Sequence, residues 1–170
     1  QSCLLDSLRL LVRICPNVTV SIPDELNPLL DECHNLADRI AFYAAIEFIN
    51  DPPKFTAYDA ILCIGTDARP DLPWTVINSN GWLARVSSGQ SGLATNCAQP
   101  NPIGALAAAS LGVAEIFKRL LRVKASRGQY FDGLSFSLYS YQSGESAGPE
   151  LPDALFMEFL LVGAGAIGNG

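Results

Sequence analysis

The 170-residue sequence predicts an α/β fold in which a mixed sheet is flanked by helices. Strand-like segments alternate along the chain with segments of helical periodicity, which is typical of α/β sheets. Residues 60–66 (AILCIGT) are almost wholly apolar, as in a parallel strand covered on both faces. Residues 74–78 and 82–87 are two further strand-like runs, joined through the tight-turn signal Asn80-Gly81. This antiparallel pair makes the predicted sheet mixed.

The first half of the chain predicts a strand followed by a long helix. Residues 17–22 (NVTVSI) alternate β-branched apolar residues with polar ones, as strands do. Asn27 then offers an N-terminal cap, and Pro28 suits the first helical position. Apolar residues recur from there at helical spacing, which predicts a helix to about Ala45. Residues 46–50 (IEFIN) fit either a short strand or the frayed end of that helix.

The second half predicts another helix and another strand. Asn101 and Pro102 repeat the cap-and-proline pair, and helical periodicity continues to about residue 122. Gly and Ala crowd the first half of this helix, where each glycine costs about 1 kcal/mol relative to alanine. Such small side chains let a helix lie close against a sheet or another helix. Residues 131–141 alternate apolar and serine side chains, which predicts a half-exposed strand.

A stretch rich in Gly, Ser and Pro marks the clearest domain boundary. We therefore divide the chain into a first lobe (residues 1–142), a linker (residues 143–154) and a terminal segment (residues 155–170). In the terminal segment an apolar run leads into a G-x-G-x-x-G motif. The candidate cofactor-binding residues of this motif are Gly163, Ala164, Gly165 and Gly168.

The glycine motif suggests a phosphate-binding turn without its helix. At the end of a strand such glycines permit a tight turn and let backbone N–H groups approach a phosphate. They also admit a closely packed helix whose N-terminus faces the anion. That helix would follow Gly170, where the given sequence stops. We therefore expect the chain to be the front part of a longer protein and, on its own, to bind ATP or NAD weakly or not at all.

Composition and charge argue against several classes of function. With a net charge of −6 and a pI near 4.6, the chain lacks the basic excess typical of nucleic-acid binding. Residues 118–124 (KRLLRVK) hold four cations, which we interpret as a helix C-terminus where positive charge complements the dipole. No stretch of the sequence is long and apolar enough to span a membrane.

The cysteines and the single histidine predict neither a metal site nor a catalytic centre. The five cysteines are irregularly spaced, and with His34 alone they supply no zinc-ligand pattern. We interpret them as free thiols of a cytoplasmic protein. Cys97, in a polar loop, is a minor alternative as a nucleophile, although no histidine lies near it in the sequence to activate it. We assign no catalytic residue and no metal ligand.

Three stretches together resemble the ThiF/MoeB family of adenylyltransferases, which includes the ubiquitin-activating enzymes. LLVGAGAIGNG (residues 160–170) is similar to the ATP-binding turn of that family. Residues 58–89 resemble the later segment in which a strand ends in an Asp-bearing loop and a second strand and Gly-turn follow. NPIGALAAASLGVAEIFKRLL (residues 101–121) resembles the small-residue helix that comes next. The second and third stretches precede the glycine turn here, although they belong to the back of an adenylation lobe.

This order implies two Rossmann-like lobes in tandem, of which the first is degenerate. The resemblance implies that the intact protein uses ATP and magnesium to adenylate the C-terminal carboxylate of a ubiquitin-like or sulfur-carrier protein. The first lobe would then be a structural partner that docks against the missing active lobe as a pseudo-dimer, with no cofactor of its own. PDEL (residues 23–26) contains no glycine after the first strand, and Thr66-Asp67-Ala68 stands where the family has T-D-N. The family also donates an arginine from one lobe to the ATP of the other, for which Arg9, Arg13 and Arg39 are candidates.

Two other classes of protein stay open from the sequence. The glycine turn could begin the cofactor site of an NAD(P)-dependent oxidoreductase, in which an acidic residue would follow about 20 positions later. Alternatively the chain could be a non-catalytic protein-binding module with an exposed apolar face, to which Trp74, Trp82 and Tyr130 could contribute. Self-association into a homo-oligomer is also possible.

Overall fold

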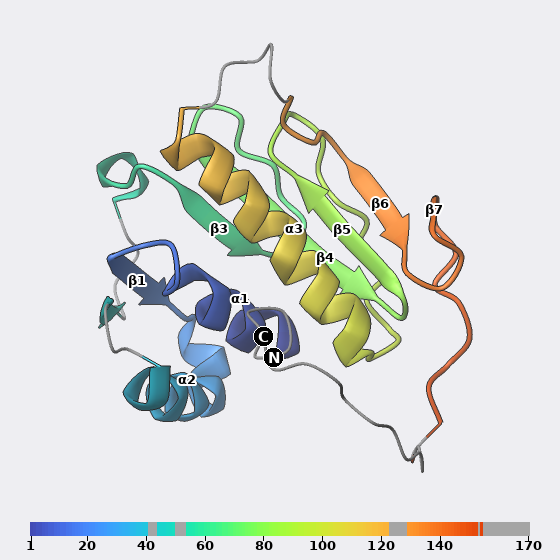
Figure 1. Ribbon diagram of the computed structural model, residues 1–170, viewed down its shortest axis with the longest axis horizontal. Helices are drawn as coiled ribbons and strands as arrows, with labels where there is room; N and C mark the ends of the chain where they lie inside the picture. Colours follow the sequence, from blue (N-terminus) through green and yellow to red (C-terminus); the bar gives the residue numbers. More distant parts are fainter. Residues whose placement is uncertain (41–43, 50–53, 123–128, 153, 155–170) are drawn as a thin grey trace, which may run out of the picture.

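The computed structural model describes residues 1–40, 44–49, 54–122, 129–152 and 154 (Figure 1). It confirms a mixed α/β architecture in which helices flank a mixed sheet. The α-helices are α1 (Ser2–Leu11), α2 (Asn27–Ile40) and α3 (Pro102–Leu120). The strands are β1 (Asn17–Ser21), β2 (Ala45–Ile49), β3 (Ile61–Ile64), β4 (Trp74–Asn80), β5 (Leu83–Ser87), β6 (Leu134–Ser137) and β7 (Gln142–Ser143). Two short 3-10 helices are η1 (Asp24–Leu26) and η2 (Phe55–Ala57).

β1, α2 and β2 form a unit of two parallel strands connected by a helix. The strands pair in register from Asn17 opposite Ala45 to Ser21 opposite Ile49. One stripe of α2 is buried with apolar side chains of β1 and with Leu8 of α1. α2 includes Asn27, which the sequence predicts as the cap before the helix, and it follows η1 directly; it ends at Ile40, before the predicted end near Ala45. Residues 45–49 are a strand, which decides between the two interpretations of that segment.

The five-stranded sheet has the order β3-β4-β5-β6-β7. β3 and β4 are parallel, and the remaining neighbours are antiparallel, so the sheet is mixed as predicted. Asn80 pairs with Leu83 across the β4–β5 turn, where Gly81 has a φ of 57° that glycine adopts without strain. Figure 1 shows β1 and β3 running in the same direction, so their carboxyl ends lie toward the same side of the molecule.

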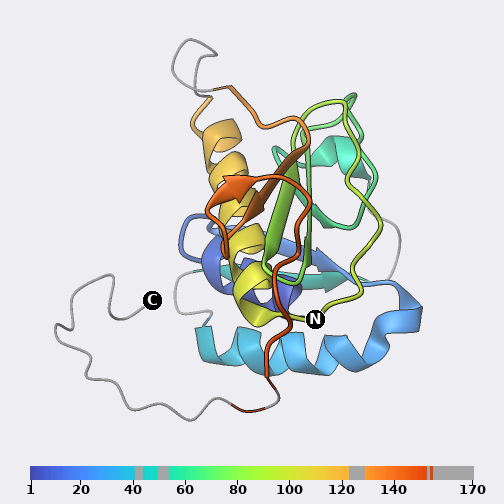
Figure 2. The same cartoon turned by 90° about the vertical axis from the view of Figure 1, so that its right-hand side faces the viewer.

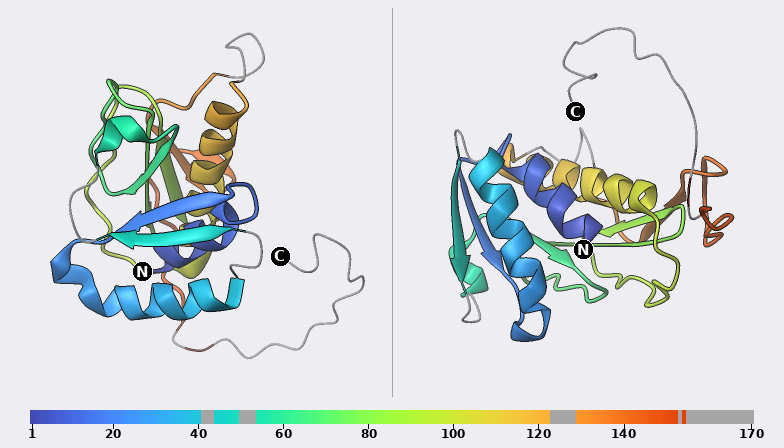
Figure 3. Two further views of the ribbon diagram at one scale, coloured as in Figure 1. Left: turned by 90° about the vertical axis from the view of Figure 1, so that its left-hand side faces the viewer. Right: turned by 90° about the horizontal axis from the view of Figure 1, so that it is seen from below.

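The two faces of this sheet have different covers. α3 lies across β4 and β5 on one face, with α1 beside it (Figures 1 and 3). The segment between β5 and α3, residues 88–101, crosses the opposite face (Figure 2). Leu93 of this segment joins Trp74 and Val76 in a small core cluster. The main core under α3 contains Ile77, with the other members Cys3, Ala84, Val86, Ala105 and Ala108.

α3 begins and packs as its sequence predicts. The Asn101 side chain accepts a hydrogen bond from the backbone N–H of Ile103 at 2.9 Å, and Pro102 occupies the first turn. A Cβ at Gly112 would lie 2.6 Å from Ile77 Cγ2, and one at Gly104 would lie 2.1 Å from the Gly81 carbonyl oxygen. The small residues therefore bring α3 close to the sheet of its own lobe.

The predicted strand over residues 131–141 is wrong in its length. β6 spans only Leu134–Ser137, because Gly133, with a φ of 74°, precedes it and a turn follows it. In that turn Tyr141 has a φ of 55°, so an extended conformation cannot continue through it. The two-residue strand β7 then pairs with β6 at the edge of the sheet.

Candidate functional site

The connection from β1 to α2 is the position at which a nucleotide-binding βαβ unit holds phosphate. Here it is residues 22–26, and the 3-10 turn η1 fills it. The N–H of Leu26 is used within the turn, because it donates to the Pro23 carbonyl at 2.8 Å. Pro23 has no N–H to offer. The connection contains no glycine, so backbone N–H groups are not laid open toward a ligand as in a phosphate-binding turn.

The loop after β3 carries Asp67 on the surface. The indole Nε1 of Trp74 donates to the Asp67 carbonyl at 2.9 Å, and the Thr66 hydroxyl donates to the Asp67 carboxylate at 3.2 Å. Arg69 lies over the rings of Phe55 and Trp74, with its Cζ 5.1 and 5.0 Å from their centroids. These contacts fix the backbone of the loop and leave the Asp67 side chain exposed.

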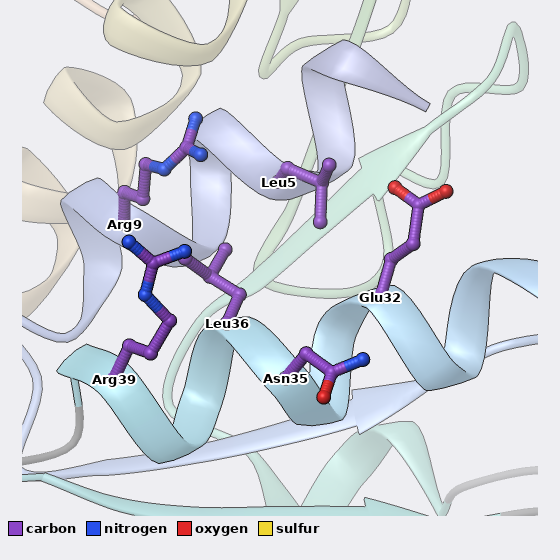
Figure 4. A pocket seen from close by; sticks show the side chains of 6 residues that line it. All are labelled: Leu5, Arg9, Glu32, Asn35, Leu36 and Arg39. Carbon is purple, nitrogen blue, oxygen red and sulfur yellow. The ribbon is translucent and has the colours of Figure 1, made fainter.

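A hollow of about 210 Å³ lies between α1 and α2 (Figure 4). Leu5 and Leu36 provide its apolar part. Arg9 from α1 and Arg39 from α2 lie at one end of the hollow, and Glu32 lies at the other. Arg9 also donates to Asp6 one turn earlier in α1, at 2.8 Å. The structure therefore brings together two of the three candidate arginines.

Arg13, the third candidate, lies apart from this pair. It lines a separate hollow of about 250 Å³ together with Val12, Ile14, Cys15 and Pro16. Two guanidinium groups at one end of a hollow offer N–H donors that suit an oxyanion such as phosphate or carboxylate, although Asp6 pairs with Arg9 and takes up part of its charge. The Arg9–Arg39 hollow is accordingly the strongest candidate for a polar ligand site among the described residues.

A buried polar network that the sequence analysis missed lies under residues 88–101. Arg85 has a side chain only 1% exposed, and its Nη2 donates to Asn96 Oδ1 and to the Glu145 carboxylate, both at 2.8 Å. Asn78 Nδ2 donates to the carbonyls of Gly65 and Ala94, each at 3.0 Å. The sequence contained a clue to this network, because Arg85 is a single charged residue within an otherwise apolar strand. Such a residue is rarely buried unless it is paired.

The basic residues at the end of α3 form hydrogen bonds and an ion pair with neighbouring segments. Arg119 Nη2 donates to the carbonyls of Trp74 and Ser88, at 2.8 and 3.0 Å. Lys118 pairs with the fully buried Glu115, which also accepts a hydrogen bond from the N–H of Phe131 at 3.0 Å. Lys118 and Arg119 therefore lie in the last helical turn, as predicted, and both also anchor neighbouring backbone.

Among the described residues, the remaining candidates from the sequence form no reactive pair. Gly163, Ala164, Gly165 and Gly168 lie outside the described residues. The His34 ring packs against Phe48 with centroids 3.9 Å apart. Within the described ranges, no three His, Cys, Asp or Glu side chains are placed to hold a metal ion.

The thiols differ in their surroundings. Cys97 is exposed, whereas burial raises the pKa of the four other thiols: Cys3, Cys15, Cys33 and Cys63. All five cysteines are free.

No described helix combines the length and the hydropathy needed to cross a membrane.

Comparison with known proteins identifies one family. No curated protein matches the chain. Residues 1–134, which include every element from α1 to α3, match the family described as the BilD N-terminal domain. Because this match covers most of the sequence, the chain belongs to the BilD N-terminal domain family.

Proposed function

We propose that the chain is a nucleotide-incompetent, Rossmann-like lobe of an ATP-dependent adenylating enzyme. The observation that carries this proposal is the β1–α2–β2 unit, in which a parallel βαβ arrangement has a glycine-free 3-10 turn where phosphate would bind. The unit keeps the topology of a nucleotide-binding fold without its phosphate-binding turn. A suitable glycine sequence is present in the chain, but at residues 163–168, after the described lobe.

The intact protein would activate the C-terminal carboxylate of a ubiquitin-like or sulfur-carrier protein. ATP with magnesium, bound by the second lobe, would supply the adenylyl group and pyrophosphate as the leaving group. A carboxylate oxygen of the carrier protein would bond to the α-phosphorus while the bond from that phosphorus to pyrophosphate breaks. The ThiF/MoeB resemblance at residues 58–89, 101–121 and 160–170 supports this reaction class.

The role of the first lobe would be to dock against the second as a pseudo-dimer partner. Its Arg9–Arg39 hollow offers two guanidinium groups that could meet the phosphate oxygens of ATP held by the active lobe. The loop at Asp67 keeps an aspartate but has Ala68 in place of the family's asparagine. We therefore do not assign Asp67 as a magnesium ligand in this lobe.

Two further observations agree with the proposal. The family to which the chain belongs is described as an N-terminal domain, which fits a lobe that precedes an active one. All five cysteines are free thiols, which suits the reducing cytoplasm in which we place the enzyme.

The decisive experiment is pyrophosphate exchange into ATP by the full-length parent protein in the presence of its carrier protein. Gly165→Asp would put a carboxylate where the second lobe binds phosphate, so exchange should be lost. Asp67→Ala, on the degenerate lobe, should leave the exchange rate within about twofold of the unmodified protein, a difference well under 1 kcal/mol. Loss of exchange in Asp67→Ala with retention in Gly165→Asp would assign the nucleotide to the first lobe and overturn the proposal.

The 170-residue chain provides a second test that needs no carrier protein. Titration calorimetry with Mg-ATP should show no binding in the micromolar range, because the described connection between β1 and α2 is a glycine-free 3-10 turn. Micromolar affinity for ATP would contradict the proposal. Micromolar affinity for NAD(P) would favour the oxidoreductase alternative instead.

A further inference from the structure

The outer face of α3 carries no charged side chain for five turns. Six residues at helical spacing form this face, which we call the outer stripe: Ile103, Leu106, Ser110, Ala114, Phe117 and Leu121, the last in the cap. The four large apolar members are 41%, 48%, 46% and 58% exposed, in chain order. Solvent-facing helix surfaces normally carry charged and polar residues, so a continuous apolar stripe indicates a contact surface.

The fold of the described lobe does not use this stripe. The opposite face of α3 is buried against the sheet through Gly104, Ala108 and Gly112. One flank of α3 is covered by α1, where Cys3 Sγ contacts the Ala105 carbonyl at 3.6 Å. Figure 1 looks onto α3 with the sheet behind it, and the outer stripe lies away from both covers.

Read from either end of the outer stripe, large and small side chains follow in the same order: two large, two small, two large. Large apolar residues occupy both ends, Ile103 and Leu106 at one and Phe117 and Leu121 at the other. The small residues Ser110 and Ala114 lie between them. A second, antiparallel copy would therefore place small residues opposite small ones, where two helices can approach closely, and large ones opposite large ones. A two-fold interface requires such self-complementarity.

Charges at the two ends of the outer stripe are also complementary. Arg122 is exposed at the C-terminal end of α3. The acidic residue Glu150 lies near the N-terminal end, because Trp82 Nε1 donates to the adjacent Pro149 carbonyl at 2.8 Å and Trp82 follows the turn residue Gly81, which packs against Gly104. Antiparallel pairing brings the basic end of one copy to the acidic end of the other, whereas parallel pairing would place like charges together.

We propose that two copies of this chain associate through the outer stripe, with their α3 helices antiparallel about a two-fold axis near Ser110 and Ala114. The stripe extends over about 27 Å, since its first and last residues are 18 positions apart at about 1.5 Å per residue. The association is independent of the adenylation reaction, and its test contains no nucleotide. Failure of one proposal therefore leaves the other standing.

The test is sedimentation equilibrium of the 170-residue chain. The unmodified chain should dimerise with a dissociation constant in the micromolar range. Leu106→Glu or Phe117→Glu should weaken the dimer at least about tenfold, because each buries a carboxylate in the apolar contact. Leu26→Glu is the matched control, since Leu26 is also 48% exposed but lies on η1. A monomer at every concentration, or equal weakening by Leu26→Glu and Leu106→Glu, would overturn the proposal.

A charge exchange tests the direction of pairing. Arg122→Glu and Glu150→Arg should each weaken the dimer, because each places like charges across the interface. The double variant should restore the affinity of the unmodified chain, because it re-creates opposite charges with their positions exchanged. Absence of this rescue would contradict the antiparallel arrangement. Circular dichroism of every variant would show whether a loss of association reflects a loss of fold.

Discussion

The guanidinium of Arg85 donates to the carboxylate of Glu145 at 2.8 Å, and the pair ties the segment after β7 to the middle of the sheet. The two side chains differ in environment, since that of Arg85 is 1% exposed and that of Glu145 is 63% exposed. Trp82 holds the same segment by donating from its Nε1 to the Pro149 carbonyl at 2.8 Å. Residues 145–149, which precede the glycine motif in the sequence, are thus fastened to β5.

Removing Arg85 should destabilise the lobe more than removing the charge of Glu145. Arg85→Ala leaves the Asn96 side chain without its hydrogen-bond donor and opens a cavity in the buried network. It should lower the free energy of unfolding by about 3 kcal/mol. Glu145→Gln keeps an acceptor beside Arg85 and should cost about 1 kcal/mol. Urea unfolding measures both values. An Arg85→Ala variant as stable as the unmodified chain would show that the network contributes nothing to stability.

The close approach of Gly104 to Gly81 makes position 104 intolerant of even one methyl group. A Cβ there would meet the Gly81 carbonyl oxygen at 2.1 Å, a backbone atom that cannot rotate away. Gly104→Ala should therefore lower the free energy of unfolding by about 2 kcal/mol, although alanine is the better helix former. Ser110→Ala, on the outer face of the same helix, should change it by no more than about 0.5 kcal/mol. Thermal or urea unfolding of the two variants provides the comparison.

Local sequence patterns predicted most elements because their causes are local. The cap at Asn101 and the turn at Gly81 depend on neighbouring residues. The strand at residues 61–64 was predicted as parallel, but its expected cover on both faces is wrong, because β3 lies at the edge of the sheet and Ile64 is 41% exposed. α1 was not predicted, because its buried face combines Cys3 and Ser7 with Leu8 and so shows no clear apolar period. β6 was predicted too long because its alternation of apolar and serine residues continues into the turn that Tyr141 ends with a positive φ.

The candidate site depended on contacts that no local pattern contains. Arg9 and Arg39 were among three arginines that the sequence could not distinguish, and only the packing of α1 beside α2 groups these two. The partners of Arg85 come from two loops, at Asn96 and Glu145, whose paths across the sheet the sequence does not specify. Composition and motifs thus suggested a class of chemistry, whereas the residues that lie together in the candidate site are determined by tertiary packing.

Exposure and pKa together predict which thiol reacts first. Burial raises the pKa of Cys3, Cys15, Cys33 and Cys63, so little thiolate forms on them near neutral pH. Cys97 is exposed and should be alkylated by iodoacetamide well before the others. Mass spectrometry of peptides after brief treatment would rank the five sites. Faster labelling of any buried thiol than of Cys97 would contradict the packing described here.

Asp132 should make the stability of the lobe fall at low pH. Its carboxylate accepts hydrogen bonds from the Ser91 N–H at 2.7 Å and the Ser87 hydroxyl at 3.4 Å. The Ser91 backbone bond is the main cause that lowers the pKa of Asp132 below its usual value. A carboxyl whose pKa is lower in the folded state contributes stability that is present above the unfolded pKa and is lost as pH falls through the folded pKa. This loss should begin below about pH 4.

Asp132→Asn removes this titration and so provides the comparison. Urea unfolding at a series of pH values should show a smaller loss of stability below about pH 4 in the variant than in the unmodified chain. Identical pH profiles would mean that the hydrogen bonds at Asp132 do not favour its charged form.

Arg9 and Arg39 should influence adenylation by the intact protein, whereas Arg13 should not. The pair lies at one end of the hollow between α1 and α2, and Arg13 lines a different one. If the pair meets the phosphates of ATP on the second lobe, Arg9→Ala with Arg39→Ala should lower kcat/KM for pyrophosphate exchange about a hundredfold, or about 3 kcal/mol. Arg13→Ala serves as the control for the loss of an arginine from the same lobe, and the single variants Arg9→Ala and Arg39→Ala, which each remove one charge as it does, should both be slower than it. Equal activities of the double variant and Arg13→Ala would show that the hollow has no part in the reaction, and the partner arginine would then have to lie elsewhere.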